Sequence, residues 1–289
     1  MISPINYDFE KAEPQPGHLA SSLVAMISFF RGLPFFISRR PRTPLRVFCM
    51  MAFDTVHVLR YARRMPSDKL QNLALLLDFG ASANDFFDKN GFSRQEYRVT
   101  RWLLERAEAN VAIDEYMSRL RYLENRRPSL SGDSLQPKKI RTYRESVIRL
   151  SLGMVAATAL NNLTIEDGIQ ATHCDEDLEM LYRIVMLCQI IDDVLDFAKD
   201  TRDGLPSFLT AHISPNQALA LTLKAAMRYA DLGSLPSSPY VFPFRLAMLG
   251  MLILTKVAIM FGRWRLRFYV LRNRITSITG WYASTDAHS

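Results

Sequence analysis

The segment MLCQIIDDVLDFAKDTRDGLPSF, residues 186–208, places five aspartates in a run that is otherwise largely apolar. They are Asp192, Asp193, Asp196, Asp200 and Asp203. Neighbouring carboxylates repel one another, and a carboxylate is costly to bury without a compensating charge. The pattern therefore predicts that this segment meets a positively charged partner.

We expect a helix from about Asp177 to Asp200, because Gly204 then supplies the usual stop signal. In such a helix Asp192, Asp196 and Asp200 stand four residues apart and drift by only about 40° per step, which produces one acidic stripe. Apolar residues surround the stripe, which indicates that it faces a cavity.

The composition favours an all-α fold. Only 12 of the 289 residues are glycine, whereas leucine, alanine, methionine and arginine are plentiful. Helical periodicity predicts further helices over 44–64, 69–88, 94–127, 143–163 and 215–229. The length is compatible with one large domain or two small ones, and we expect a single domain over 1–289.

The charge and the cysteines restrict the class of protein. The net charge is +7, but the basic residues are dispersed and no nucleic-acid motif accompanies them, so we expect no nucleic-acid partner. An anionic small substrate or an acidic membrane surface is equally compatible. Three cysteines without a C-x-x-C pair argue against a disulfide framework or a zinc site, and the first residues lack a secretory signal. These features favour the cytoplasm.

Two segments near the end of the chain are relevant to membranes. The apolar run 244–261 is interrupted by Arg245 and Lys256, and we expect it to form a buried core helix. The segment GRWRLRFYVLRNR, residues 262–274, combines arginines with aromatic residues. It is compatible with peripheral contact to an anionic membrane, and core packing is the alternative.

A second acidic group lies about a hundred residues earlier, in NDFFD, residues 84–88. Asp85 and Asp88 stand three positions apart and can share one helix face with Asp78. A solvated acidic face is the alternative to a functional site. If the two groups face each other, they suit Mg²⁺, which takes one or two carboxylates together with substrate phosphates.

The segment QIIDDVLDFAKDTRDG resembles the second aspartate motif of the squalene/phytoene synthase family, within the class I isoprenoid synthase superfamily. Asp196 and Asp200 match its D-x-x-x-D pair, and Gln189 heads it. NDFFD is similar to the first motif, D-D-x-x-D, with asparagine at position 84. The resemblance extends over roughly residues 45–275.

The resemblance implies an all-α bundle around a central apolar pocket, Mg²⁺ as cofactor and an allylic prenyl diphosphate as substrate. It assigns catalysis and metal binding to the aspartates of the two motifs. These are Asp85, Asp88, Asp192, Asp196 and Asp200. The expected substrate-binding residues are Gln189, Asp193 and nearby cations that can bind diphosphate. These cations are Lys199, Arg202, Arg144 and Arg183.

The expected reaction is ionisation of a farnesyl- or geranylgeranyl-type diphosphate and coupling of the allylic cation to a second prenyl unit. Cyclisation of one prenyl diphosphate is the alternative, and the spacing of Asp192, Asp196 and Asp200 also matches the cyclase metal triad. A non-catalytic isoprenoid-binding homologue is a further alternative. Both a monomer and a homodimer are compatible with the sequence.

Overall fold

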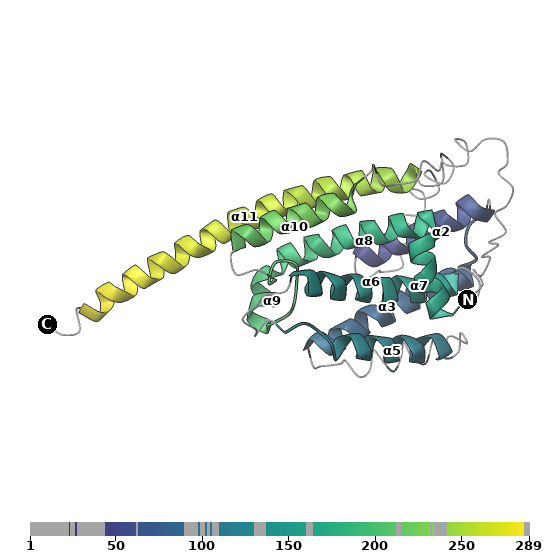
Figure 1. Ribbon diagram of the computed structural model, residues 1–289, viewed down its shortest axis with the longest axis horizontal. Helices are drawn as coiled ribbons and strands as arrows, with labels where there is room; N and C mark the ends of the chain where they lie inside the picture. Colours follow the sequence, from purple (N-terminus) through teal and green to yellow (C-terminus); the bar gives the residue numbers. More distant parts are fainter. Residues whose placement is uncertain are drawn as a thin grey trace. The chain divides into compact units, whose positions relative to one another are not determined.

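A computed structural model describes seven stretches of the chain and six single residues. The stretches are 44–61, 63–89, 110–129, 137–159, 164–211, 215–231 and 242–285, and the single residues are Leu23, Ile27, Arg98, Trp102, Glu105 and Gly233. These stretches contain helices and no strand (Figure 1). The all-α prediction is therefore confirmed.

The described stretches contain helices of 7 to 44 residues. They are α2 (Pro44–Tyr61), α3 (Ser67–Lys89), α5 (Asn110–Glu124), α6 (Pro137–Ala159), α7 (Ile165–Cys174), α8 (Glu176–Leu195), α9 (Phe197–Asp203), α10 (Pro215–Tyr229) and α11 (Phe242–Thr285). The bounds of α10 coincide with the predicted 215–229. Part of the predicted helix 94–127 falls outside the described residues.

Helix α7 was not predicted, although its start carries a sequence signature. The Thr164 hydroxyl accepts a hydrogen bond from the Asp167 N–H at 3.1 Å, and the Asp167 carboxylate accepts one from the Thr164 N–H at 3.1 Å. This reciprocal pair is a capping box, which satisfies donors that a helix start otherwise leaves unpaired. The T-x-x-D spacing at 164–167 could have located the helix.

The chain divides into two compact units, each assembled from three segments. Unit 1 comprises Met1–Arg126, Ser146–Val185 and Leu232–Met248. Unit 2 comprises Arg127–Glu145, Met186–Asp231 and Leu249–Ser289. Helices α6, α8 and α11 each contribute residues to both units. The single-domain expectation stays a prediction.

Unit 1 is organised by close helix packing. Helix α2 packs along α3, and α5 contacts α7. Where α6 meets α7, a Cβ atom on Gly168 would overlap the Gly153 carbonyl group, so the two backbones touch. Glycine at both positions therefore permits the close approach of α6 and α7.

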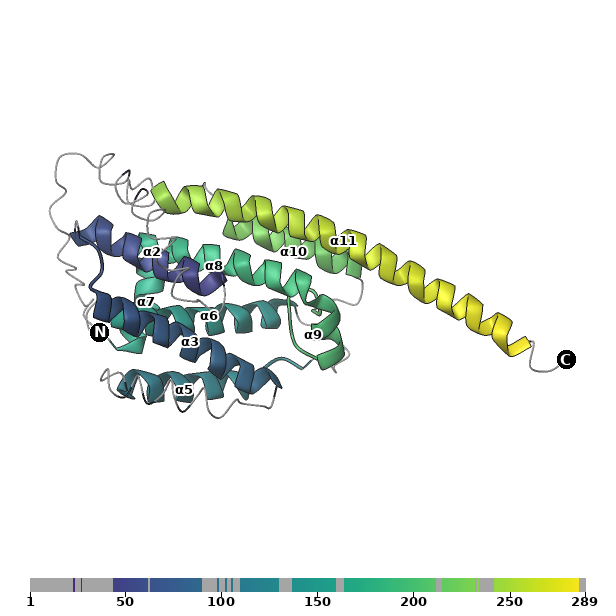
Figure 2. The same cartoon turned by 180° about the vertical axis from the view of Figure 1, so that it is seen from behind.

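Unit 2 contains the acidic segment and is tied together across long sequence distances. The Tyr229 hydroxyl of α10 donates to Glu145 Oε1 of α6 at 2.6 Å. Helices α10 and α11 run side by side in both views (Figure 1 and Figure 2). Gly262 of α11 lies so close to Val194 and Leu219 that a Cβ there would come within 2.8 Å of Val194.

Helix α11 corrects the expectation of a buried core helix. Eight of its large apolar side chains are 45–69% exposed. They are Leu246, Leu249, Ile253, Leu254, Val257, Met260, Phe261 and Trp264. A helix that is apolar on most of its surface does not indicate which side will be covered. In the part of α11 whose side chains the structure describes, a stripe that includes Met248, Leu252 and Ile259 is buried.

The segment Pro243–Arg265 within α11 is long and apolar enough to cross a membrane by length and composition, with a mean hydropathy of 1.9. From the sequence we expected the charges at Arg245 and Lys256 to exclude a membrane span. The length and composition of this segment do not support that exclusion. A span of 23 residues meets the roughly 20 residues that a bilayer core requires.

Candidate functional site

The acidic segment lies where α8 ends and α9 begins, and the chain bends there. The predicted helix through Asp200 is interrupted at Asp196, whose backbone dihedrals are φ −92° and ψ 5°. Backbone hydrogen bonds flank the bend: the Asp196 N–H donates to the Asp192 carbonyl at 2.8 Å, and the Asp196 carbonyl accepts from the Asp200 N–H at 2.9 Å. Aspartate is weak inside helices and common where helices start, which fits this position.

The glycine stop after α9 was predicted, although the helix ends at Asp203 and not at about Asp200. Gly204 adopts the left-handed conformation with φ 67°, and the Leu205 N–H donates to the Asp200 carbonyl at 2.8 Å. This arrangement is the usual glycine-terminated helix end. Because of the bend and this turn, the aspartates of the segment differ in burial and in their partners.

Asp193 is 1% exposed and is bound on both carboxylate oxygens. Its Oδ1 accepts from Gln189 Nε2 at 2.7 Å and faces an Arg144 nitrogen at 3.4 Å. Its Oδ2 accepts from the Phe208 backbone N–H at 2.7 Å. Two predicted substrate-binding residues, Gln189 and Arg144, thus bind a third, Asp193. The three together anchor the loop after α9 to α8.

The other carboxylates crowd around this anchor. Asp200 is 6% exposed, and burial followed by the charge of Asp193 raises its pKa to about 7. Burial and then the charges of Asp193 and Asp196 also raise the pKa of Asp192. Asp196 is half-buried and lies 3.6 Å from Lys199 Nζ. Negative charge is therefore in excess at the junction.

The basic residues predicted to bind substrate differ in whether they contact the aspartates of this segment. Arg144 and Lys199 contact its aspartates, at 3.4 and 3.6 Å. The Arg202 side chain is 75% exposed and pairs with Asp203 at 3.2 Å. Arg183 belongs to unit 1, where it pairs with Glu179 at 2.9 Å. Arg144 and Lys199 are thus the cations placed to bind a ligand at the junction.

The first motif belongs to α3 in unit 1. The helix continues through Asp85 and Asp88 to Lys89, as the sequence predicts. The side chains of Asp85 and Asp88 lie outside the described residues. Their assignment as metal ligands stays a prediction.

The donor set at the junction suits a metal ion only in part. Among the residues that the structure describes, three or more histidine, cysteine, aspartate or glutamate side chains do not gather as a metal site. Asp193 accepts protein donors on both oxygens, whereas Asp192 is partly buried but still reaches solvent, and Asp196 pairs with Lys199. These two carboxylates fit a Mg²⁺ ion that a substrate phosphate and water also coordinate.

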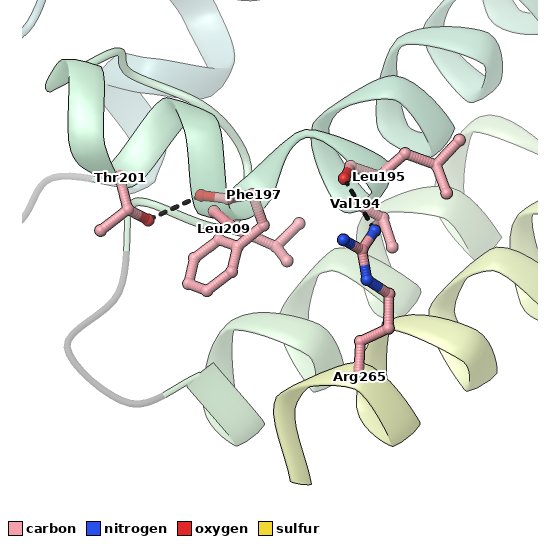
Figure 3. A pocket seen from close by; sticks show the side chains of 8 residues that line it. Val194, Leu195, Phe197, Thr201, Leu209 and Arg265 are labelled. Atoms are coloured by element: carbon pink, nitrogen blue, oxygen red, sulfur yellow. Dashed lines mark hydrogen bonds between the residues drawn. The ribbon is translucent and has the colours of Figure 1, made fainter. Parts of the chain in front are cut away.

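A small apolar cavity of about 190 Å³ borders the same segment (Figure 3). Val194, Leu195 and Phe197 line it, so the apolar residues between the aspartates do wall a cavity. No aspartate is among its lining residues, which differs from the predicted acidic stripe facing a cavity. Its polar groups include Arg265, which donates to the Leu195 carbonyl at 3.3 Å.

Sequence reasoning missed Phe208 and Arg265. The Phe208 contribution is a backbone N–H, and no side-chain pattern marks such a donor. Arg265 comes from α11, 70 residues beyond Leu195, so only the fold brings the two together. No family model, curated protein or solved structure matches this chain.

Proposed function

We propose that the protein is a Mg²⁺-dependent class I isoprenoid synthase. In this proposal it ionises an allylic prenyl diphosphate of the farnesyl or geranylgeranyl type, within a helical bundle around a central apolar pocket. The observation that carries the proposal is the crowding of Asp192, Asp193, Asp196 and Asp200 at the α8–α9 junction. Such an excess of carboxylate charge is relieved by a bound cation.

The residues at the junction would have two roles, metal binding and phosphate binding. Asp192 and Asp196 would hold the ion, which supplies charge neutralisation for the departing diphosphate. Lys199 and Arg144 are the nearest protein cations for phosphate oxygens. In the reaction the C1–O bond breaks, its electron pair leaves with diphosphate, and the alkene of a second prenyl unit forms the new C–C bond. The cation that this leaves on the second unit then loses a proton to diphosphate or water, which gives a neutral alkene. Cyclisation uses the same ionisation, with an alkene of the same chain as the nucleophile.

A non-catalytic isoprenoid-binding protein is a second candidate, and one observation favours it. Asp193 is committed to Gln189, Arg144 and the Phe208 N–H, which leaves fewer carboxylates for metal at the junction.

The test is to incubate the purified protein with farnesyl and geranylgeranyl diphosphates, with and without Mg²⁺. Diphosphate release is followed, and products are identified by mass spectrometry. Mg²⁺-dependent release supports the synthase, and the carbon number of the product separates coupling from cyclisation. Binding without release supports the non-catalytic candidate. If the protein shows no binding and no diphosphate release, both candidate functions are contradicted.

Variants test the site. Asp192→Ala and Asp196→Ala should each lower turnover by about 100-fold or more, because the metal–diphosphate complex loses a ligand. Asp203→Ala is the matched control, since Asp203 lies outside the crowded group and pairs with the exposed Arg202. Circular dichroism checks that the variants stay folded. Normal turnover in Asp196→Ala would refute the assignment.

We also propose that α11 places the protein at a membrane, with the helix lying along the surface. The exposed apolar face from Leu246 to Trp264 would meet the lipid. Arginines at 263, 265, 267, 272 and 274 continue the helix with positive charge that suits anionic headgroups. The opposite side of this helix packs on Val194 and Leu219 through Gly262. A cytoplasmic location stays an expectation.

Vesicle flotation tests this surface. The protein should float with vesicles that contain phosphatidylglycerol, and a smaller fraction should float with vesicles of phosphatidylcholine alone. The double variant Ile253→Gln/Met260→Gln should remain in the lipid-free fraction. Met227→Gln is the control, because Met227 is also exposed, at 47%, but lies on α10. If the wild type does not float and the double variant instead dissociates a dimer in light scattering, the face binds a second copy and the membrane proposal fails.

A further inference from the structure

A second cavity in unit 2, of about 330 Å³, lies on the residues of α6, α10 and the loop after α9. Its walls include the first turn of α6 from Pro137, the loop residue Phe208, and one face of α10 from Leu221 to Arg228. The volume is within the range of small-molecule pockets. No aspartate or glutamate is among its lining residues.

The cavity is strongly basic. Lys138, Arg141, Lys224 and Arg228 all line it. Within the described part of the chain, only Arg141 of these four has an ion-pair partner, Glu145 at 3.6 Å. Glu145 also accepts the Tyr229 hydroxyl on the same oxygen, at 2.6 Å. The other three cations thus have no ion-pair partner among the residues that the structure describes.

The start of α6 adds to this positive potential. The 23-residue helix begins at Pro137, which lines the cavity, and its first turn carries no acidic residue. Backbone N–H groups at a helix start are unpaired within the helix, and the helix dipole favours an anion there. The four cations and the helix start therefore act together.

Two buried polar atoms of the lining residues have no hydrogen-bond partner among the described residues. They are the Thr222 hydroxyl oxygen and Arg141 Nε. Thr222 is 1% exposed and lines the cavity. A buried hydroxyl in a helix usually finds an acceptor, as the Thr255 hydroxyl does at the Met251 carbonyl, 2.7 Å away. The Thr222 group is thus available to a ligand.

The remaining wall is apolar. Ile140, Phe208 and Ala211 line the cavity, and they are 2%, 7% and 2% exposed. Phe208 is fixed by its backbone hydrogen bond to Asp193. A ligand that fills this space would place an apolar portion against Ile140 and Phe208 and an anionic end among the basic side chains.

We propose that this cavity binds a small amphipathic anion, with a phosphate or carboxylate end and a short hydrocarbon portion. The basic side chains and the α6 start would hold the anion, and the Thr222 hydroxyl would donate a hydrogen bond to it. This binding needs no Mg²⁺ and no aspartate, so it does not rest on the proposed synthase activity. The same chemistry is offered by a soluble amphiphile or by a phospholipid headgroup.

Octyl phosphate, used below its micelle concentration and in EDTA, is the probe for titration calorimetry on the full chain. Wild-type protein should bind it, with inorganic phosphate and octanol each at least about tenfold weaker, because each lacks one half of the recognised chemistry. Lys224→Gln/Arg228→Gln should weaken binding about tenfold or more. Lys256→Gln, an exposed cation on α11, should leave it unchanged.

The double variant changes two exposed side chains, and circular dichroism checks its fold. A second arm uses vesicles with and without phosphatidic acid. Binding to octyl phosphate that the double variant loses supports a soluble amphiphile. Binding only to phosphatidic acid vesicles, again lost in the double variant, supports a lipid headgroup as the source. Binding to neither probe, or equal binding by wild type and double variant, overturns the proposal.

Discussion

The acidic junction of α8 and α9 and the basic cavity beside α6 and α10 belong to the same unit, and each has a charge imbalance of opposite sign. In the junction, Asp193 takes three protein donors, and its neighbours Asp192, Asp196 and Asp200 are left in excess. In the cavity, Glu145 forms an ion pair with Arg141 and accepts a hydrogen bond from the Tyr229 hydroxyl. The other three cations have no ion-pair partner among the described residues. Paired charges therefore hold the unit together, and surplus charges are the candidates for ligand binding.

Removal of a paired charge should have the largest effect on stability. Asp193→Ala takes away a buried carboxylate and leaves the Phe208 N–H without its acceptor. We expect a loss of about 3 kcal/mol in the free energy of unfolding, measured by urea denaturation. Asp203→Ala should change it by less than about 0.5 kcal/mol, because its partner Arg202 is exposed. Equal effects of the two variants would remove the distinction between paired and surplus aspartates.

The two regions also differ in how far the sequence reveals them. The acidic residues lie within nine consecutive positions, 192–200, so their clustering is visible before any fold is known. The basic cavity combines residues near 138, 208 and 224, and each of these is an ordinary exposed or core residue in its own segment. Only the packing of α10 on the start of α6 creates the site.

Within the acidic segment, the helix and its glycine stop were predictable, but the bend at Asp196 was not. Local propensity marks aspartate as a weak helix residue without indicating which one will bend the chain. The choice of Asp193 as the buried anchor depends on Phe208 and Arg144, 15 and 49 residues away. Periodicity also identified α11 as apolar, but it could not show which face is covered.

A surplus buried carboxylate should make stability depend on pH. The pKa of Asp200 is raised to about 7 in the folded chain, so the protonated form is favoured there. This contribution is complete below pH 3.8, the ordinary pKa, and is lost as the pH rises through 7. In EDTA, Asp200→Asn should match wild type near pH 4 and exceed it at pH 8 by about 2 kcal/mol, after allowance for solvent screening.

Parallel urea titrations at these two pH values measure the difference. A constant gap between wild type and Asp200→Asn across the range would mean that Asp200 does not titrate near neutrality. The surplus of charge at the junction would then be smaller than the structure indicates.

In the cavity, the unpartnered hydroxyl gives a matched pair of variants. Thr222 and Thr255 are 1% and 0% exposed, but only Thr255 has an acceptor, the Met251 carbonyl. Thr222→Val should stabilise the ligand-free protein by about 1 kcal/mol, because it removes a buried hydroxyl that lacks a partner. Thr255→Val should not stabilise it. If Thr222→Val is as destabilising as Thr255→Val, the hydroxyl is already satisfied and the cavity loses one of its ligand-binding groups.

The smallest effect should come from the surplus cations themselves. Lys138 and Lys224 are exposed, so water screens their repulsion, but no carboxylate lines the cavity with them. Lys138→Gln and Lys224→Gln should each raise the free energy of unfolding by about 0.3 kcal/mol at low salt, and the gain should vanish near 0.5 M NaCl. Lys256→Gln should show no such gain if the effect belongs to the cavity. A loss of stability in the two cavity variants would show that these lysines are paired after all, and the contrast with the acidic junction would then rest on that junction alone.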